Sequence, residues 1–314
     1  MKVGVIGVGY WGKKHVAEYR NLGINDITAV DLSHYNLEFC RRNFGAATSN
    51  DINFIAENTG IEAVSICTPN DTHHSVCKKI LLSGKNVLLE KPMTLSSGDA
   101  SELIDISEKM GKILCVGHIY RHNNAVKFLK NMVDKKDLGN IYNVNIKWNN
   151  LENIWEDRDI VFDLAPHPLD IILYLFNKTP GKVSCHGGGF RQKNNEIAFI
   201  NYRLGGVFVN IELSWITPLK ERKMTVVGSE KTAFVDCLSQ TIKVMDNSSR
   251  LSTDMSVVPN NTLKDELLYF LECVRKGVHP DMDGRVGREI VRIIELSNKS
   301  LEDNREISIN SSAG

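Results

Sequence analysis

The sequence lacks paired cysteine motifs, an excess of charge of either sign, and any long apolar run. Seven scattered cysteines without a CxxC spacing indicate buried free thiols, and they favour neither a disulfide framework nor a bound metal. Because the 38 basic and 38 acidic residues cancel, the net charge gives no reason to expect nucleic acid or a membrane as partner. No tract is long enough to span a bilayer, and we do not expect the opening MKVGVIG to be a leader. We therefore expect a cytoplasmic protein.

At 314 residues the chain is too long for one ordinary core, so we place one domain at residues 1–120 and a second at residues 121–314. The first domain alternates amphipathic stretches with short apolar runs. These runs cover residues 2–7, 26–31, 63–69, 86–90 and 113–117. Continuous apolar strands separated by helices are typical of a doubly wound parallel sheet of the Rossmann type.

A glycine-rich loop, GVGYWG, follows the first predicted strand and opens the first predicted helix. Gly7 permits a tight turn, Gly9 lets a pyrophosphate approach the backbone, and Gly12 lets the helix pack closely on the strand. The free N–H groups of the helix N-terminus attract the phosphates. The loop therefore predicts dinucleotide binding, with Tyr10 and Trp11 among its contacts.

Asp31 closes the second strand, where a carboxylate can accept hydrogen bonds from the ribose hydroxyls and repels a 2′-phosphate. No arginine follows directly, so NAD is favoured, and NADP is not excluded. Ligands of such sheets bind beyond the carboxyl ends of the strands. The ends of two further strands therefore supply the other cofactor candidates, which are Thr68, Pro69, Asn70, His73, Glu90 and Lys91. His73 also fits a simple helix start.

The segment FDLAPHPLDIILYLF, residues 162–176, predicts an apolar helix with an unusual start. Pro166 and Pro168 are tolerated in a first helical turn, where the N–H groups lack partners within the helix. They would hold His167 at the positive end of the helix dipole, which lowers its pKa and favours a neutral imidazole. Such a group suits a general base near neutral pH, with Asp163 one turn earlier to orient it.

After residue 121 the pattern changes to short alternating runs joined by tight turns, which predicts an antiparallel sheet. The runs lie at residues 142–148, 197–204, 207–215, 223–228, 232–236 and 241–246, and two amphipathic helices follow. The sheet face away from the helices would expose apolar area. We therefore expect a second copy to cover it, giving a homodimer or homotetramer.

Together these pieces resemble the Gfo/Idh/MocA family, the glucose–fructose oxidoreductase and inositol dehydrogenase group. The matching segments run in family order and are GVIGVGYWG, CTPNDTHH, LLEKPMTLS, VGHIYRHNNAV, DLAPHPLD and GREIVRIIELSNKS. The resemblance implies a Rossmann domain, an open-sheet domain, and NAD(P)-dependent oxidation or reduction of sugars, cyclitols and related polyols. The chain departs from the family at His122 and Asn124, where relatives usually have Phe and Pro.

The resemblance also implies catalytic roles for three residues. Lys91 matches the catalytic lysine of the family's EKP motif, and Asp163 and His167 match its catalytic Asp–His pair. Hydride would leave a carbinol carbon for the nicotinamide while His167 takes the hydroxyl proton. Lys91, from the other domain, would hydrogen-bond the same oxygen and stabilise its developing negative charge.

The substrate side of the site is less specified by the sequence. Its candidates are His118, Arg121, Asn123, Trp148, Lys220 and Arg222, with Asn149, Asn150 and Trp155 as further polar or aromatic residues. SWITPLKER resembles a segment of relatives in nucleotide-sugar pathways, where Lys220 and Arg222 would meet phosphates.

The preferred interpretation is a sugar or nucleotide-sugar dehydrogenase, and its sharper version is oxidation of a UDP-hexosamine at position 3. Three other functions stay open at this stage: an inositol-type cyclitol dehydrogenase, a redox-neutral NAD-dependent glycosidase, and a non-catalytic NAD-sensing regulator. Retention of Lys91 and His167 argues against the regulator.

Overall fold

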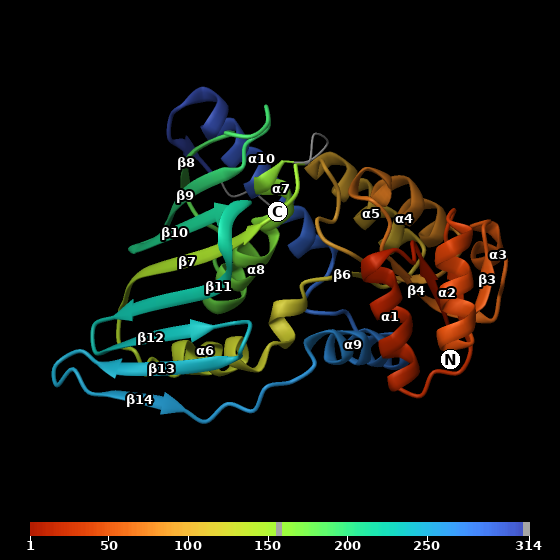
Figure 1. Ribbon diagram of the computed structural model, residues 1–314, viewed down its shortest axis with the longest axis horizontal. Helices are drawn as coiled ribbons and strands as arrows, with labels where there is room; N and C mark the ends of the chain where they lie inside the picture. The colour runs from red at the N-terminus through yellow and green to blue at the C-terminus, as the bar shows by residue number, and fades with distance from the viewer. Residues whose placement is uncertain (155–158, 310–314) are drawn as a thin grey trace. The chain divides into compact units, whose positions relative to one another are not determined.

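The computed structural model describes residues 1–154 and 159–309, and its contacts divide the chain into two compact units (Figure 1). The first unit joins residues 1–118 to residues 261–291, and the second joins residues 119–260 to those from 292 onward. The sequence-based division placed everything after residue 120 in one domain. Residues 261–291 differ from that expectation, because they pack with the first unit.

The first unit contains a six-stranded parallel sheet with the strand order β3-β2-β1-β4-β5-β6. Its strands are β1 (Lys2–Ile6), β2 (Ile27–Val30), β3 (Ala47–Ser49), β4 (Ile61–Ile66), β5 (Asn86–Leu89) and β6 (Leu114–Val116). Its helices include α1 (Tyr10–Asn21), α2 (His34–Phe44), α3 (Asn53–Ala56), η1 (Asn70–Thr72), α4 (His73–Leu82), α5 (Ser97–Lys109) and α9 (Thr262–Lys276). The predicted doubly wound parallel sheet is confirmed, and β3 is a short strand that the sequence did not indicate.

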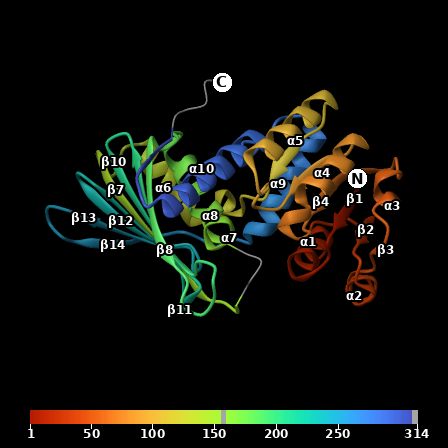
Figure 2. The same ribbon diagram turned by 90° about the horizontal axis from the view of Figure 1, so that it is seen from above.

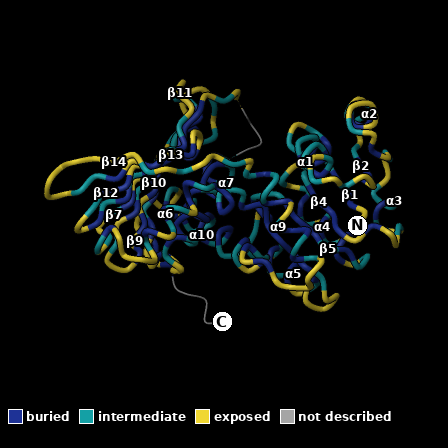
Figure 3. The backbone as a smooth tube through the Cα atoms, turned by 90° about the horizontal axis from the view of Figure 1, so that it is seen from below, coloured by how far each residue is buried: buried dark blue, intermediate teal, exposed yellow. Residues whose placement is uncertain are grey.

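The central strands are buried on both faces, as their continuous apolar sequences predict. Figure 3 shows β4 and β5 largely in the colour of buried residues; every residue of β5 after Asn86 is buried, and Glu62 is the one exposed residue of β4. Helix α1 places His15, Val16 and Tyr19 in the interior and also packs against α9. The sheet therefore has a firm core from which the loops at its carboxyl edge project.

The second unit contains a nine-stranded sheet with the order β14-β13-β12-β11-β7-β10-β9-β8-β15. The strands are β7 (Ile141–Leu151), β8 (Lys182–Gly188), β9 (Ile197–Leu204), β10 (Val207–Ser214), β11 (Ile216–Gly228), β12 (Lys231–Asp236), β13 (Thr241–Asp246), β14 (Ser252–Met255) and β15 (Ile307–Ser308). The expected open sheet is confirmed. It is mostly antiparallel, although β7 and β10 pair in parallel.

Helices lie on one face of this sheet, as Figure 2 shows for α6 (Asn124–Asp134) and α8 (Pro166–Phe176). The short helix η2 (Ile119–His122) comes directly before α6, and the short helix α7 (Ile160–Leu164) comes directly before α8. Helix α10 (Gly284–Asp303) has its first residues in the first unit and its remaining residues in the second. Within the described residues no helix has the length and apolar character needed to cross a membrane.

The alternation along β7 separates the two faces of the sheet. Val144, Ile146 and Trp148 are buried on the helix side, whereas Asn145 and Lys147 are exposed on the other. Trp148 pairs with Leu213 of β10 on one side and with Arg222 of β11 on the other. An arginine therefore occupies a buried cross-strand position on the helix-covered face.

Candidate functional site

The glycine-rich loop between β1 and α1 has the geometry that its sequence predicts. Gly7 has a φ of +81°, and a Cβ there would lie 2.7 Å from the backbone of Cys67. A Cβ on Gly12 would overlap the carbonyl oxygen of Gly7, whereas a Cβ on Gly9 would meet no atom within 4 Å. Helix α1 begins at Tyr10 without a side-chain cap, so its first N–H groups are available to phosphate oxygens. The loop offers an open backbone cradle at Gly9.

Asp31 follows β2 directly and is held by local hydrogen bonds. Its Oδ1 accepts the backbone N–H of Ser33 at 2.7 Å and the side-chain amide of Asn36 at 3.4 Å. The Nζ of Lys13 in turn donates to Asn36 Oδ1 at 2.7 Å. The carboxylate is therefore fixed at the end of β2, and a cation that the sequence did not indicate lies in the same network.

The turn after β4, which contains Thr68 and Pro69, is linked to the loop after β5 by a buried histidine. His73 Nδ1 lies 2.8 Å from the carbonyl oxygen of Pro92, and Nε2 lies 3.0 Å from the carbonyl oxygen of Thr68. The Lys91–Pro92 peptide bond is cis. His73 is fully buried, so its ring joins two loops that carry cofactor candidates.

Glu90 is the centre of a second cluster at the carboxyl end of β5. Its Oε1 accepts hydrogen bonds from Trp11 Nε1 at 2.7 Å and His15 Nε2 at 3.0 Å, and its Oε2 accepts the backbone N–H of Lys91 at 3.2 Å. Burial alone would raise the pKa of Glu90, but the bonds from His15 and Trp11 hold that pKa below its usual range. Glu90 is therefore a carboxylate that ties the glycine-rich loop to the segment bearing Lys91.

In the second unit, two consecutive short helices position Asp163 and His167. Asp163 lies on α7, whose first N–H groups are capped by the Asp159 side chain at 2.9 and 3.0 Å. Helix α8 begins at Pro166, so His167 is in its first turn, as the two prolines predict. Both side chains are half-buried.

Aromatic rings surround His167. The ring of Tyr120 lies edge-on to the imidazole with centroids 5.1 Å apart, and the ring of Trp148 lies 6.0 Å away. Tyr120 and Trp148 also contact each other, at 4.8 Å. Arg222 places its guanidinium carbon 5.1 Å from the Trp148 ring centroid on the same face of the sheet.

Two substrate candidates are buried in structural contacts of the second unit. Arg121 forms an ion pair with Asp170 at 2.7 Å, and both side chains are at least nine-tenths buried. Asn123 caps α6 by accepting the N–H groups of Ala125 and Val126, and its amide donates to the Cys237 carbonyl at 3.0 Å. These bonds account for both residues without a substrate.

The remaining substrate candidates are scattered. Lys220 is exposed on β11, whereas His118 is buried and belongs to the first unit. Arg222 is buried, and both of its terminal nitrogens donate within the chain. Trp155 lies outside the described residues. The predicted substrate contacts of these residues stay predictions.

Two family models match the chain in sequence order. Residues 1–118 match the oxidoreductase family with an NAD-binding Rossmann fold, and residues 126–234 match the GFO/IDH/MocA C-terminal domain. The chain belongs to the GFO/IDH/MocA family. As a member of it, the chain is an NAD-binding oxidoreductase, which confirms the family and cofactor predictions.

Individual GFO/IDH/MocA relatives cover nearly the whole chain. UDP-N-acetylglucosamine 3-dehydrogenase of Acidithiobacillus ferrooxidans is 28% identical, covering 93% of this chain and 94% of its own. A solved structure of that protein superposes with a TM-score of 0.87 over 96% of this chain. Myo-inositol 2-dehydrogenase of Thermotoga maritima is 22% identical over 98% of both chains.

One cluster in this GFO/IDH/MocA chain has the composition of a metal site. Among the described residues, ligand atoms of His15, Cys67 and Glu90 lie within 4.8 Å of one another. Burial, with the nearby charge of Glu90, raises the pKa of the Cys67 thiol well above its usual value, and a thiol is a poor ligand. The same Glu90 oxygen already accepts two hydrogen bonds. The cluster is better suited to holding Glu90 than to binding an ion.

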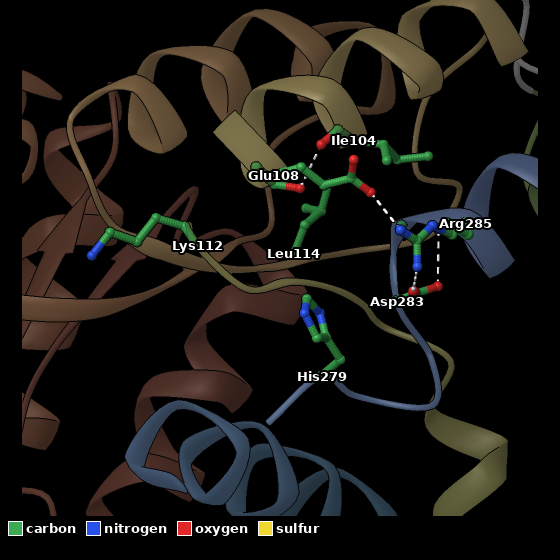
Figure 4. A pocket seen from close by; sticks show the side chains of 9 residues that line it. Ile104, Glu108, Lys112, Leu114, His279, Asp283 and Arg285 are labelled. Atoms are coloured by element: carbon green, nitrogen blue, oxygen red, sulfur yellow. Dashed lines mark hydrogen bonds and ion pairs between the residues drawn. The ribbon is translucent and has the colours of Figure 1, made fainter. Parts of the chain in front are cut away.

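A small surface hollow lies elsewhere in the first unit, among α5, β6 and the start of α10 (Figure 4). Arg285 spans its rim and pairs with Glu108 at 2.6 Å and Asp283 at 3.8 Å. His279 and Lys112 also line it. None of the predicted cofactor or catalytic residues contributes to this hollow, and the charges of Arg285, Glu108 and Asp283 pair with one another.

Two residues that contact the predicted site residues were not themselves predicted. His15 contributes through its contact with Glu90, and Tyr120 through its contact with His167. The only sequence signal for His15 is its place in the first predicted helix, three positions after Gly12. Tyr120 lies between the predicted candidates His118 and Arg121, but nothing in its sequence neighbourhood distinguishes it from a core aromatic.

Proposed function

We propose that this chain is an NAD-dependent dehydrogenase that oxidises a ring hydroxyl of a nucleotide sugar, with the 3-hydroxyl of a UDP-hexosamine as the preferred target. The observation that carries the proposal is the 28% identity with a UDP-N-acetylglucosamine 3-dehydrogenase over 93% of the chain. The substrate class comes from that relative, and the chemistry comes from the residues of this chain.

The cofactor cradle fits a dinucleotide. The open backbone at Gly9 and the uncapped start of α1 bind a pyrophosphate, and the Asp31 carboxylate accepts hydrogen bonds from the ribose hydroxyls. When bound, NAD supplies the hydride acceptor. Thr68, Pro69 and Asn70 form the neighbouring turn, and Glu90 holds the loop position of Lys91.

His167 acts in this proposal as the general base for the substrate hydroxyl. Its place in the first turn of α8 brings the positive helix end close to the ring, which favours the neutral imidazole. Asp163 orients the imidazole or the substrate, and the Lys91 ammonium hydrogen-bonds the reacting oxygen. Proton removal by His167 and charge stabilisation by Lys91 together promote departure of the hydride from the carbinol carbon.

A cyclitol is the second candidate substrate, because myo-inositol 2-dehydrogenase of Thermotoga maritima aligns over 98% of this chain. The two candidates are separated by a screen of UDP-sugars, free sugars and inositols with NAD or NADP, followed by absorbance of the reduced cofactor. We expect the largest kcat/KM with a UDP-hexosamine and NAD. NADH formation only with free polyols would favour the cyclitol function.

The catalytic roles are tested with Lys91→Ala and His167→Ala in the same screen. Removal of a general base or of an oxyanion donor typically lowers kcat by about 10²–10⁴-fold. We expect losses of this size while NADH still binds, as measured by fluorescence titration. Wild-type turnover by either variant would remove that residue from the mechanism.

We also propose that two copies associate through the open face of the nine-stranded sheet, as a homodimer or within a homotetramer. Phe199, Phe208 and Phe234 are each more than a third exposed on three strands of that sheet. Apolar side chains on an uncovered sheet favour a partner.

The seven cysteines are free thiols, which suits the reducing cytoplasm that we propose as the site of action.

A further inference from the structure

Arg222 has an unusual place for an arginine, because it points into the helix-covered face of the sheet. It pairs across strands with Trp148, where the neighbouring positions of β11 on that face are Met224 and Val226. Its exposed fraction is 8%. A buried cation is costly unless it is hydrogen-bonded, so this position requires specific partners.

The partners of the Arg222 guanidinium hold it rigidly in one orientation. Nη1 donates to the carbonyl oxygens of Asn149 and Glu221, each at 2.8 Å, and Nη2 donates to Asn150 Oδ1 at 2.8 Å. These bonds use both terminal nitrogens. The guanidinium carbon also lies over the Trp148 ring, 5.1 Å from its centroid, in a cation–π contact.

The same guanidinium connects to both members of the proposed catalytic pair. Burial lowers the pKa of Arg222, while Tyr120, by charge and by a hydrogen bond, and the nearby charge of Asp163 act in the opposite direction. Tyr120 and Trp148 are the two rings that contact the His167 imidazole. Arg222 thus contacts both aromatic rings that flank His167, and it interacts with the charge of Asp163.

We propose that Arg222 is a positioning residue for His167 that acts through Tyr120 and Trp148 and does not contact the substrate. The kinetic consequence of this inference rests on the function proposed above, whereas its structural consequence does not. By fixing both aromatic rings, Arg222 limits the orientations of the imidazole. A lysine in its place would keep the charge but lose the planar fork that grips Asn149, Glu221 and Asn150.

The primary test follows the ring signals of His167 by NMR in the full chain, assigned with His167→Asn. Contact with two aromatic rings shifts these signals away from those of a free histidine. In Arg222→Met and Arg222→Lys we expect the His167 signals to move toward those of a free histidine, because Arg222 no longer fixes the Tyr120 and Trp148 rings. Lys223→Met is the matched control, since Lys223 is adjacent on β11 and half-exposed, and it should leave the signals in place.

If Arg222→Met does not fold, Arg222→Lys decides the question. Unchanged His167 signals in every folded Arg222 variant would overturn the proposal. This readout needs no turnover, so it is separate from failure of the proposed function, which would instead appear as wild-type activity of His167→Ala.

Kinetics give a second, independent decision. A positioning role predicts that Arg222→Lys lowers kcat about tenfold or more with little change in KM, because an imidazole that is misplaced by a fraction of an ångström is a poorer base. Direct phosphate contact predicts instead a rise in KM for UDP-sugars with kcat kept. The latter result would overturn the proposal and restore Arg222 as a substrate residue.

Discussion

The Nδ1 atom of His73 lies 2.8 Å from the carbonyl oxygen of Pro92, and this contact links the loop after β4 to the loop after β5. The second ring nitrogen reaches the Thr68 carbonyl at 3.0 Å. Both loops contain residues of the proposed cofactor site. A single buried imidazole therefore sets the spacing between two segments that must bind one ligand.

His73 makes the stability of the chain depend on pH. Burial lowers the pKa of His73 despite the two backbone hydrogen bonds, which act in the opposite direction. Because the folded-state pKa is below the unfolded value of about 6.5, the stabilisation is present above about pH 6.5 and is lost as pH falls through the folded-state pKa. His73→Gln removes this titration. We expect the melting temperature to fall less in His73→Gln than in wild type between about pH 7.5 and about pH 5.5.

His34→Gln provides the matched control for that comparison, because His34 is exposed at the start of α2. Its melting temperature should follow the wild-type curve over the same range. Parallel curves for His73→Gln and wild type would contradict the role assigned to the buried ring.

The glycines of the loop between β1 and α1 should separate cofactor binding from folding. In Gly9→Ala the new methyl group meets no atom of the chain within 4 Å, so we expect the melting temperature to change little. The methyl group would occupy space that the pyrophosphate needs, and NADH affinity should fall by about tenfold or more. In Gly12→Ala the methyl overlaps the Gly7 carbonyl, which should destabilise the fold by about 1–3 kcal/mol. Normal NADH binding by Gly9→Ala would exclude the proposed cradle.

Asp31 should control the choice between NAD and NADP. Asp31→Ala removes the acceptor of the ribose hydroxyls and the charge that repels a 2′-phosphate, so NAD should bind more weakly and NADP more tightly. Lys13, which reaches the Asp31 network through Asn36, would then supply a cation for the phosphate. Dissociation constants for both reduced cofactors measure the change. Asp26→Ala, at an exposed carboxylate, is the control, and equal affinities in Asp31→Ala and wild type would remove Asp31 from the site.

Features that depend on adjacent residues could be predicted from the sequence. The parallel sheet follows from alternating apolar runs and amphipathic stretches, and the helix start at His167 follows from two flanking prolines. The loop at Gly7 has the positive φ that its place after a strand requires. In each case the local chemistry leaves few other structures available.

Features that depend on distant pairing could not be predicted. The parallel contact of β7 with β10 joins strands far apart in the chain, and no alternation of residues distinguishes it from an antiparallel one. The interior place of Arg222 is a second example, because arginine is usually exposed and its burial follows from the β7–β11 register. Likewise, the link between Trp11 and Glu90 spans 79 positions, and no motif records it.

The return of α9 to the first unit has a consequence for synthesis. Residues 1–118 leave the ribosome long before Leu267 and Phe270, which are fully buried side chains of that helix. Until then the surface of α1 that α9 covers faces solvent. The nucleotide-binding half of the chain is therefore completed only after eight of the nine strands of the large sheet have been translated, and a fragment ending at residue 118 should be prone to aggregate.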